Sequence, residues 1–402
     1  MSKMKPEIRF GEFADAWEKR KLEDLADVRD GTHNSPQYYS EGHPLITSKN
    51  VKNGFINYDD IQYISDGDFE EINRRSKVDK NDILMGMIGT IGNIALVRET
   101  PDFAIKNVAL IKDIEKVYCV YLYHYLQSSS ILNQLSEGMD GGTQKFIALN
   151  KIRNLIIAVP RIEEQYKISN YMEHLDNLIT LHQRKLDKMK NLKSAYLSKM
   201  FPKEGERYPR LRFAGFTDAW EQRKLGDITE SFSGGTPSAG NSQYYGGTIP
   251  FIRSGEISSD KTELFVTEAG LNNSSAKMVK VGDVLYALYG ATSGEVSISR
   301  INGAINQAIL AIRSTRNDDH YIIAQWLRMQ KEAIISTYLQ GGQGNLSGSI
   351  VKELMISLPA DKKEQKLISS FFHNLDNLIT LHQRELEKLK QLKQAMLQKM
   401  FV

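Results

Sequence analysis

Two glycine-rich segments of this sequence carry side chains that could form hydrogen bonds with a binding partner. The first, residues 138–146, contains Gln144 and Lys145, and the second, residues 340–347, contains Gln343 and Asn345. A carboxamide can bond the edge of an adenine base, and a lysine can reach guanine or a phosphate. An ordinary surface loop explains the same residues equally well, so base contact is one of two open interpretations.

No arrangement of residues typical of catalysis accompanies these loops. The sequence contains no phosphate loop, no Gly-x-Ser-x-Gly nucleophile motif and no Asn-Pro-Pro-aromatic loop of amino-methyltransferases. The eight histidines form no pair at metal-ligand spacing, and Cys119 is the single cysteine, which excludes an intrachain disulfide. We therefore expect no catalytic residue, no metal site and no cofactor in this chain, and the pattern favours recognition.

The elements that position these loops occur twice. The segment Leu-Asp-Asn-Leu-Ile-Thr-Leu-His-Gln-Arg at 175–184 returns letter for letter at 375–384. Each copy follows a glycine loop, a short apolar run, a proline and a Glu-Gln pair. An identity of ten residues at this distance indicates that the chain consists of two copies of one unit.

The repeated segment belongs to a predicted long helix. Residues 163–200 contain neither proline nor glycine, and their apolar side chains recur at helical spacing. Such a helix is roughly 57 Å long if straight, at about 1.5 Å per residue, and its apolar stripe needs a second long helix. We expect it to pack antiparallel against its twin through Leu175, Ile179, Leu186 and Met189 and, in the second copy, Leu375, Ile379, Leu386 and Leu389. Two unrelated amphipathic helices, each lying on its own domain, are the alternative.

The rest of each half alternates strands and helices. A strand, a glycine-rich turn and a strand are expected at 82–97 and again at 283–296, and a further buried strand at 104–111 and at 304–311. Helical stretches are expected around 117–135 and 320–339, and Trp17 and Trp220 are expected to be buried.

These patterns together predict an α+β fold with a pseudo-two-fold internal repeat. Two tandem mixed α/β domains are joined by two long antiparallel helices that form a coiled coil. The expected segments are domain 1 (1–160), a long central helix (161–201), a linker (202–215), domain 2 (216–359) and a long C-terminal helix (360–402).

Composition is that of an ordinary globular protein. The chain has 402 residues, of which 41% are hydrophobic and 25% are charged, and its formal net charge is +3. This weak positive charge permits nucleic-acid binding without arguing for it. No apolar run of about 18 residues and no signal-peptide pattern is present, so we expect a cytoplasmic protein that does not bind membranes.

Several of these segments resemble a known family over nearly the whole chain. They are Ser-Gly-Gly-Thr-Pro-Ser at 233–238, Gly-Gly-Thr-Ile-Pro-Phe-Ile-Arg-Ser-Gly-Glu-Ile at 246–257, Ala-Ile-Asn-Gln-Ala at 304–308, and the Pro, Glu-Gln and long helix that end each half. The chain is similar to the specificity subunit of bacterial Type I restriction-modification enzymes. The first half fits less closely, because it lacks the Gly-Gly-Thr-Pro-Ser run and has Asn107-Val108 where the second has Asn306-Gln307.

The resemblance implies a division of labour among subunits. Each of two target-recognition domains would read one half of a bipartite site in double-stranded DNA, and the paired helices would set the spacer and dock two modification (methyltransferase) subunits. S-adenosylmethionine, ATP and Mg would be used by the modification subunits and by the restriction (translocase and nuclease) subunits, and none by this chain.

With DNA as the expected partner, lysines and arginines could hold phosphates while loop side chains read base edges. The predicted DNA-binding residues are Lys49, Lys52, Arg74, Arg75, Lys77, Gln144 and Lys145 in the first domain, and Arg253, Lys261, Lys277, Gln343 and Asn345 in the second. A coiled-coil scaffold protein without sequence-specific DNA binding is one alternative. A fragment of a fused restriction-methylation enzyme that acts alone is another.

Overall fold

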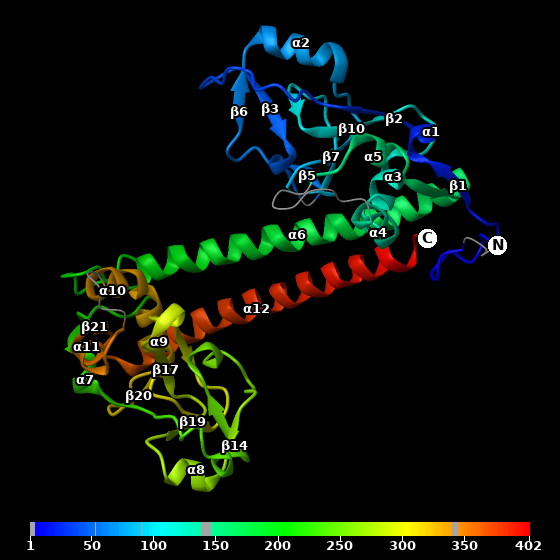
Figure 1. Ribbon diagram of the computed structural model, residues 1–402. Coiled ribbons are helices and arrows are strands. Elements are labelled where there is room, and N and C mark those ends of the chain that lie inside the picture. The colour runs from blue at the N-terminus through cyan, green and yellow to red at the C-terminus, as the bar shows by residue number, and fades with distance from the viewer. Residues whose placement is uncertain (1–4, 53, 90, 138–145, 340–344) are drawn as a thin grey trace. The chain divides into compact units, whose positions relative to one another are not determined.

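The computed structural model describes residues 5–52, 54–89, 91–137, 146–339 and 345–402 (Figure 1). The chain divides into two compact units. Unit 1 comprises Met1–Arg184 together with Gln383–Val402, and unit 2 comprises Lys185–His382. Each unit therefore contains one mixed α/β domain and a stretch of both long helices, whereas the sequence suggested five consecutive segments.

Unit 1 contains eleven strands within its described residues. They are β1 (Glu18–Lys21), β2 (Ala26–Asp30), β3 (His43–Thr47), β4 (Val51–Lys52), β5 (Phe55–Ile56), β6 (Gln62–Ile64), β7 (Ile83–Gly86), β8 (Ile94–Leu96), β9 (Ala104–Lys106), β10 (Val108–Asp113) and β11 (Ile156–Val159). Its helices are α1 (Leu22–Leu25), the 3₁₀ turn η1 (Ser48–Asn50), α2 (Asp66–Ser76), α3 (Cys119–Tyr125), α4 (Ser129–Ser136), α5 (Leu149–Arg153) and part of α6 (Ile162–Met200). The main sheets have the strand orders β2-β10-β7-β8 and β6-β3-β9.

Unit 2 repeats this plan. Its strands are β12 (Glu221–Lys224), β13 (Thr229–Ser233), β14 (Tyr245–Ile252), β15 (Phe265–Val266), β16 (Lys277–Val279), β17 (Val284–Ala287), β18 (Val296–Ile298), β19 (Gly303–Ile305), β20 (Ile309–Ser314) and β21 (Met355–Leu358). Its helices are α7 (Leu225–Ile228), η2 (Ser242–Tyr244), η3 (Ser254–Glu256), α8 (Glu268–Asn272), η4 (Gly290–Thr292), α9 (His320–Met329), α10 (Lys331–Tyr338), α11 (Gly348–Glu353) and part of α12 (Lys362–Lys399). The sheet orders β13-β20-β17-β18 and β15-β14-β19-β16 match those of unit 1, with β16 added.

The central strands are buried on both faces. In β10, Ala109 and Ile111 face one hydrophobic core while Val108 and Leu110 face another, as the alternation of side chains along a strand requires. The equivalent strand β20 divides its residues 309–312 in the same way. An unbroken apolar run is the sequence signature of such a doubly covered strand.

The runs 104–111 and 304–311, each expected to be one strand, form two. Asn107 has a φ of +54°, which ends β9, and the chain then enters the other sheet as β10. In unit 2 the break is a turn in which the Asn306 Oδ1 atom accepts a hydrogen bond from the Ala308 N–H at 3.1 Å. A strand predicted from apolar content alone could not show this change of sheet.

The helical stretches 117–135 and 320–339 are likewise divided. Unit 1 has α3 and α4, separated near Gln127, and unit 2 has α9 and α10, separated at Gln330. Trp17 and Trp220 are buried, at 4% and 0% exposure.

The two long helices begin in the same way. Near the start of α6, the Gln165 side chain donates to the Pro160 carbonyl at 2.9 Å and accepts from the Tyr118 N–H at 2.9 Å. Gln365 near the start of α12 donates to the Pro359 carbonyl at 2.7 Å and accepts from the Asp319 N–H at 2.9 Å. The glutamine of the repeated Glu-Gln pair thus ties each long helix to the proline that follows the preceding strand and to the residue that directly precedes α3 or α9.

Segments of both helices pack together inside each unit. In unit 1, Met172 and Leu175 of α6 share a core with Met400 and Phe401, while Asp176 pairs with Lys393 at 2.6 Å, which makes these segments antiparallel. In unit 2, the equivalent ion pair joins Lys193 to Asp376 at 2.6 Å. Of the predicted packing positions, Leu175, Leu186 and Leu386 are buried, and Ile179, Met189, Leu375, Ile379 and Leu389 are half-buried.

The segment 202–215, expected to be a linker, is a copy of the N-terminal segment. The Leu211 N–H donates to the Lys199 carbonyl at 2.9 Å, as the Ile8 N–H donates to the Lys399 carbonyl at 3.0 Å. The next residue in each copy is an arginine that binds a buried glutamate of a long helix. The repeated unit therefore begins before Trp17 and Trp220 and includes Arg9 and Arg212.

Candidate nucleic-acid interface

The turns η1 and η3 occupy the same place in the two units. Each follows a strand (β3 or β14) that runs parallel to its neighbour (β9 or β19). Each is closed by a side chain at its third position, where Asn50 Oδ1 accepts from the Thr47 N–H at 3.0 Å and Glu256 Oε2 accepts from the Arg253 N–H at 3.0 Å. This common turn presents exposed cations, Lys49 in unit 1 and Arg253 in unit 2.

In unit 1, Lys49 and Lys52 lie close together in the chain and are both exposed, on η1 and β4. Neither lysine takes part in an ion pair within the described residues. Their charge is therefore available to an anionic partner, as the sequence-based proposal requires.

The basic residues at the end of α2 form a second group. Ser65 caps the start of this helix by accepting from the Asp68 N–H at 3.1 Å, and Arg74 and Arg75 lie in the last turn, where the helix dipole favours positive charge. All three predicted residues here, Arg74, Arg75 and Lys77, are exposed. Arg75 is engaged in an ion pair with Asp30, and Lys77 lies 3.9 Å from Asp79.

His33 completes the cluster around Asp30. Its Nδ1 atom lies 2.7 Å from Asn107 Oδ1 and its Nε2 atom lies 2.9 Å from Asp30 Oδ2. Both neighbours are acceptors, so a doubly protonated ring satisfies both, and these contacts, first with Asn107 and then with Asp30, raise the pKa of His33. In unit 2, Thr236 donates to Gln307 Oε1 at 2.7 Å at the corresponding place, without a titratable group.

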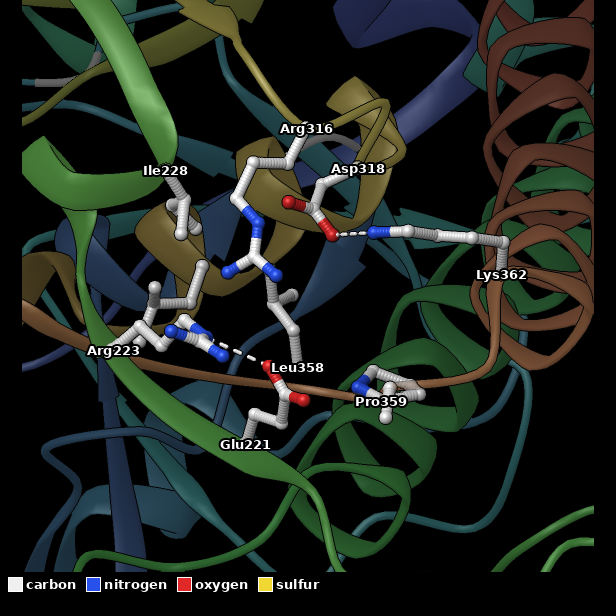
Figure 2. Close-up of a pocket in the computed structure, with 10 residues that line it drawn as sticks. Glu221, Arg223, Ile228, Arg316, Asp318, Leu358, Pro359 and Lys362 are labelled. Atoms are coloured by element: carbon white, nitrogen blue, oxygen red, sulfur yellow. Dashed lines mark hydrogen bonds and ion pairs between the residues drawn. The ribbon is translucent and has the colours of Figure 1, made fainter.

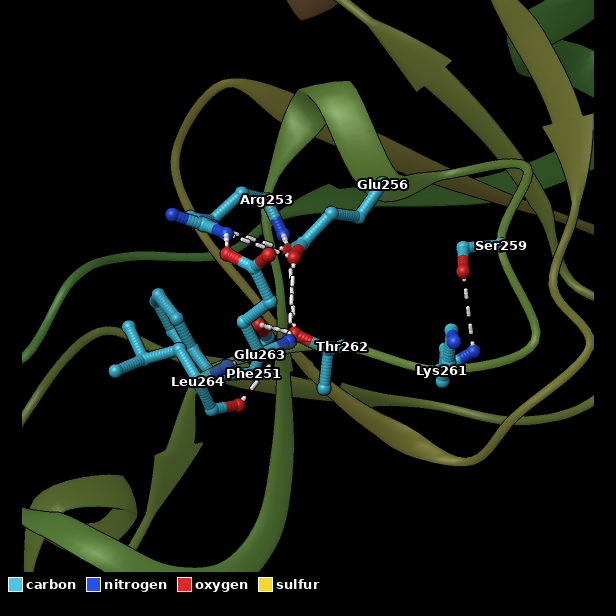
Figure 3. A network of polar contacts seen from close by, with 8 residues as sticks. All are labelled: Phe251, Arg253, Glu256, Ser259, Lys261, Thr262, Glu263 and Leu264. Atoms are coloured by element: carbon cyan, nitrogen blue, oxygen red, sulfur yellow. Dashed lines mark hydrogen bonds and ion pairs between the residues drawn. The ribbon is translucent and has the colours of Figure 1, made fainter. Parts of the chain in front are cut away.

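Figure 3 shows Arg253 of unit 2 held by two carboxylates. Its Nε and Nη2 atoms donate to Glu256 at 3.1 and 2.8 Å, and Nη2 also donates to Glu263 at 3.0 Å. The hydrogen bond from Arg253 lowers the pKa of Glu256 to about 2, and the hydrogen bond to Glu256 raises the pKa of Arg253.

Two carboxylates around one guanidinium make a poor phosphate clamp, because the local charge is negative. They do fix the orientation of Arg253, and no hydrogen bond within the described residues uses its Nη1 atom. A fixed guanidinium is suited to a guanine edge, where geometry matters more than net charge.

The remaining predicted residues of unit 2 are scattered. Lys261 is exposed in the loop after η3. Lys277 on β16 is exposed, and its Nζ atom lies 5.7 Å from the centre of the Phe232 ring. Asn345 is exposed and forms a bridge with Tyr289. Gln144, Lys145 and Gln343 lie outside the described residues.

The structure thus brings some candidates together and separates others. Lys49 and Lys52 form one group and Arg74, Arg75 and Lys77 another, while Arg253 belongs to a network with carboxylates that the sequence analysis did not single out. Also missed was Phe55, an aromatic residue that is 61% exposed beside Lys52. The Asn-Gly pair at 53–54 is a hairpin signal and could have pointed to it.

A hollow in unit 2 does not have the chemistry of a cofactor pocket. Figure 2 shows that its charged side chains turn toward one another, with Arg223 bound to Glu221 at 2.7 Å and Lys362 bound to Asp318. The first pair lies within β12, and the second joins the start of α12 to the segment before α9. Four of the charged side chains that line the hollow are thus already engaged in ion pairs of the fold.

Among the described residues, no group of three or more His, Cys, Asp or Glu side chains is placed to hold a metal ion. None of the helices in that part of the chain combines the length and apolar character that a membrane crossing needs.

Comparison with known proteins gives a consistent result. The family model described as "Type I restriction modification DNA specificity domain" matches residues 14–191 and again 217–391. The Type I restriction enzyme MjaIX specificity subunit of Methanocaldococcus jannaschii is 24% identical over 426 residues, covering 98% of this chain and 94% of that protein. The EcoBI specificity subunit of Escherichia coli is 30% identical over 170 residues, which are 40% of this chain and 35% of that protein.

Solved structures agree on the fold. The S subunit of a Type I restriction-modification system from M. genitalium superposes with a TM-score of 0.71 at 16% identity, covering 99% of both chains. A chain from a study of the assembly of the type I R-M system superposes with a TM-score of 0.55 at 19% identity, covering 95% of this chain and 96% of that chain.

Proposed function

This chain belongs to the family of Type I restriction modification DNA specificity domains, and we propose that it is the specificity subunit of such an enzyme. Each unit reads one half of a bipartite target in double-stranded DNA. The two halves differ in sequence because the two units offer different side chains on the same backbone frame.

One observation carries this proposal: equivalent turns with unlike chemistry. η1 contains Lys49 and is followed by Lys52, and neither lysine forms an ion pair within the described residues, whereas η3 is preceded by Arg253, which is fixed between Glu256 and Glu263. A lysine ammonium group can bind a phosphate or a guanine edge, and an oriented guanidinium suits a base edge. Two surfaces of unlike chemistry on one chain favour the recognition of two unlike DNA segments over the role of a scaffold protein without DNA specificity.

The long helices supply the frame in this proposal. The Asp176–Lys393 and Lys193–Asp376 pairs fix the register of the two helices within each unit. Because the helices run through both units without proline or glycine, their length sets the number of base pairs between the half-sites.

Exposed leucines on these helices support the docking of partner subunits. Unit 1 exposes Leu181 (46%) and Leu392 (39%), and unit 2 exposes Leu381 (52%) and Leu192 (41%). These positions are equivalent in the sequence repeat, so two copies of one partner can bind in the same way. We assign them to two modification subunits, and the restriction subunits join the resulting complex.

Catalysis belongs to those partners in this proposal. S-adenosylmethionine serves the modification subunits, and ATP and Mg serve the restriction subunits, while the present chain contributes recognition. The alternatives of a scaffold protein without DNA specificity and of a self-sufficient methylating fragment both predict a different outcome in the following experiment.

The test is to map methylated bases across the genome of cells that express this chain with its modification partner. The proposal predicts one bipartite motif with two unlike halves, and no methylation by either protein alone. A complex that forms but methylates without any sequence preference would support the scaffold alternative. Methylation by this chain alone would support the self-sufficient fragment.

A further inference from the structure

The two units differ most clearly in the segment that follows the common turn. In unit 1, Val51–Lys52 and Phe55–Ile56 form the strands β4 and β5, which lie between η1 and β6. In unit 2 the corresponding residues 257–264, all of them described, contain no strand before β15. If two similar units read two unlike half-sites, the difference in reading must come from segments in which the units differ.

The inner face of β4 and β5 is firmly anchored. Val51 is 0% exposed and packs in the core beside the half-buried Ile56. Asn50, 2% exposed, donates from Nδ2 to the Asn57 carbonyl at 3.1 Å, and the Asn57 N–H donates to the Asn50 carbonyl at 2.7 Å. Asn50 and Asn57 lie at the same end of the antiparallel strand pair, so these bonds hold that end in place.

Gly54 fixes the pair against the body of the unit. Its N–H donates to the Ile94 carbonyl at 3.1 Å. A Cβ at this position would lie 2.2 Å from the Tyr123 hydroxyl oxygen, and the φ of +93° disfavours any other residue. The ribbon is thus preorganised, which lowers the entropy cost of any contact it makes.

The outer face carries an aromatic ring beside a cation. Lys52 and Phe55 are direct cross-strand partners, and both are exposed, Phe55 to 61%. Exposed Tyr58 (53%) and Lys49 flank them. A rigid ribbon that holds a large apolar side chain in water, next to lysines that have no ion pair in the described part of the chain, has the composition of a nucleic-acid contact.

We propose that the outer face of β4 and β5, through Lys52 and Phe55, enters the major groove and reads bases of the first half-site. A two-stranded ribbon fits the major groove, a lysine can bind guanine O6 and N7, and an apolar ring packs on the thymine methyl group. The exposed Asp59 and Asp60 follow Tyr58 and would repel phosphates, so the contact is limited to the ribbon. This inference rests on the proposed function, because it names the reader of one half-site.

The test uses the complete complex of this chain with its modification subunits. Methylation motifs are mapped for the wild type and for Phe55→Ala, Phe55→Leu and Lys52→Ala. The matched control is Phe265→Ala, which removes an aromatic residue on β15 of unit 2 that is 38% exposed. Thermal unfolding of each variant is recorded alongside.

We expect Phe55→Ala and Lys52→Ala to reduce methylation of the wild-type motif by about tenfold or more and to relax one or two positions of one half-site only. Phe55→Leu keeps part of the thymine contact and should lose less. Phe265→Ala should leave that half-site unchanged.

Unchanged methylation of the wild-type motif by Phe55→Ala and Lys52→Ala overturns the inference, and so does relaxation of both half-sites together. If Phe55→Ala lowers the unfolding temperature, the exposed Lys52→Ala decides by the same criterion. Failure of the wild-type complex to give any bipartite motif would instead refute the proposed function, so the two failures are distinguishable.

Discussion

Removal of Arg9 should destabilise unit 1 far more than removal of a surface arginine. The Nε and Nη2 atoms of Arg9 donate to the two carboxylate oxygens of Glu164 at 2.7 Å each, and the Glu164 side chain is 1% exposed. In Arg9→Ala this carboxylate stays buried without its partner. Loss of one member of a buried ion pair costs about 3–5 kcal/mol.

The second copy offers an internal replicate. Arg212 binds Glu364, itself 1% exposed, at 2.6 and 2.8 Å. Arg212→Ala should therefore destabilise unit 2 by a similar amount. Arg161→Ala is the matched control. Arg161 forms an ion pair with Asp15 in which both side chains are exposed, so the pair should contribute less than about 1 kcal/mol to the free energy of unfolding.

The assay must report on each unit separately, because two units need not unfold in one step. Hydrogen exchange followed by mass spectrometry gives the opening free energy of peptides from each unit. Arg9→Ala should accelerate exchange in unit 1, and the double variant Arg9→Met with Glu164→Gln should recover part of the loss, since no bare charge remains buried. A loss below about 1 kcal/mol in Arg9→Ala, or a double variant as unstable as the single one, would refute this account of the clamp.

Three further predictions concern charged contacts. Because the pKa of His33 is raised in the folded state, this histidine stabilises unit 1 fully below pH 6.5, its ordinary pKa, and the stabilisation is lost as the pH rises through the raised pKa. Hydrogen exchange near Asn107 should show this pH dependence, and His33→Gln should abolish it. Glu256, whose pKa is lowered, has the opposite pH dependence. It stabilises unit 2 above pH 4.5, its ordinary pKa, and the stabilisation is lost as the pH falls toward about 2, which an NMR titration of the glutamate side chains would show. Lys393→Met, which leaves Asp176 without its partner, should destabilise unit 1 by about 1–3 kcal/mol in denaturant unfolding, and exchanging the two residues should restore part of it.

Periodicity and repetition predicted much of the architecture. The absence of proline and glycine between 163 and 200 predicted α6, which spans Ile162–Met200, and the repeat predicted its twin α12. The two copies of the family model support the tandem organisation. Local patterns are sufficient here because a long amphipathic helix depends on residues three and four positions apart.

The change of sheet at a single residue and the contacts between distant residues were not predictable in this way. Apolar content cannot show that the chain changes sheets at Asn107, because the reason is a left-handed backbone conformation at one residue. The segment 202–215 was interpreted as a linker from its polar composition, although Arg212 binds a glutamate 152 positions away. An Arg-Phe pair in both copies, at 9–10 and 212–213, was the available signal.

The candidate interface was predicted by residue type more than by placement. Exposure of Lys49 and Lys52 follows from their charge, and a lysine on a turn is exposed in most folds. The fixing of Arg253 by Glu256 and Glu263 could not be inferred, because Glu263 comes from a loop whose path depends on the whole sheet. The alternation that turns Phe55 outward was visible only once Val51 was known to be buried.

Deletion of one helical turn from both long helices tests the central claim most directly. Residues 182–185 and 382–385 occupy equivalent positions and leave the docking leucines 181 and 381 in place, and their joint removal shortens each helix by about 6 Å, at about 1.5 Å per residue, while keeping the apolar stripe nearly in phase. Methylation mapping of the resulting complex should give the same two half-sites with a changed number of base pairs between them. A motif whose half-site sequences change, or one whose spacer stays the same, would contradict the account.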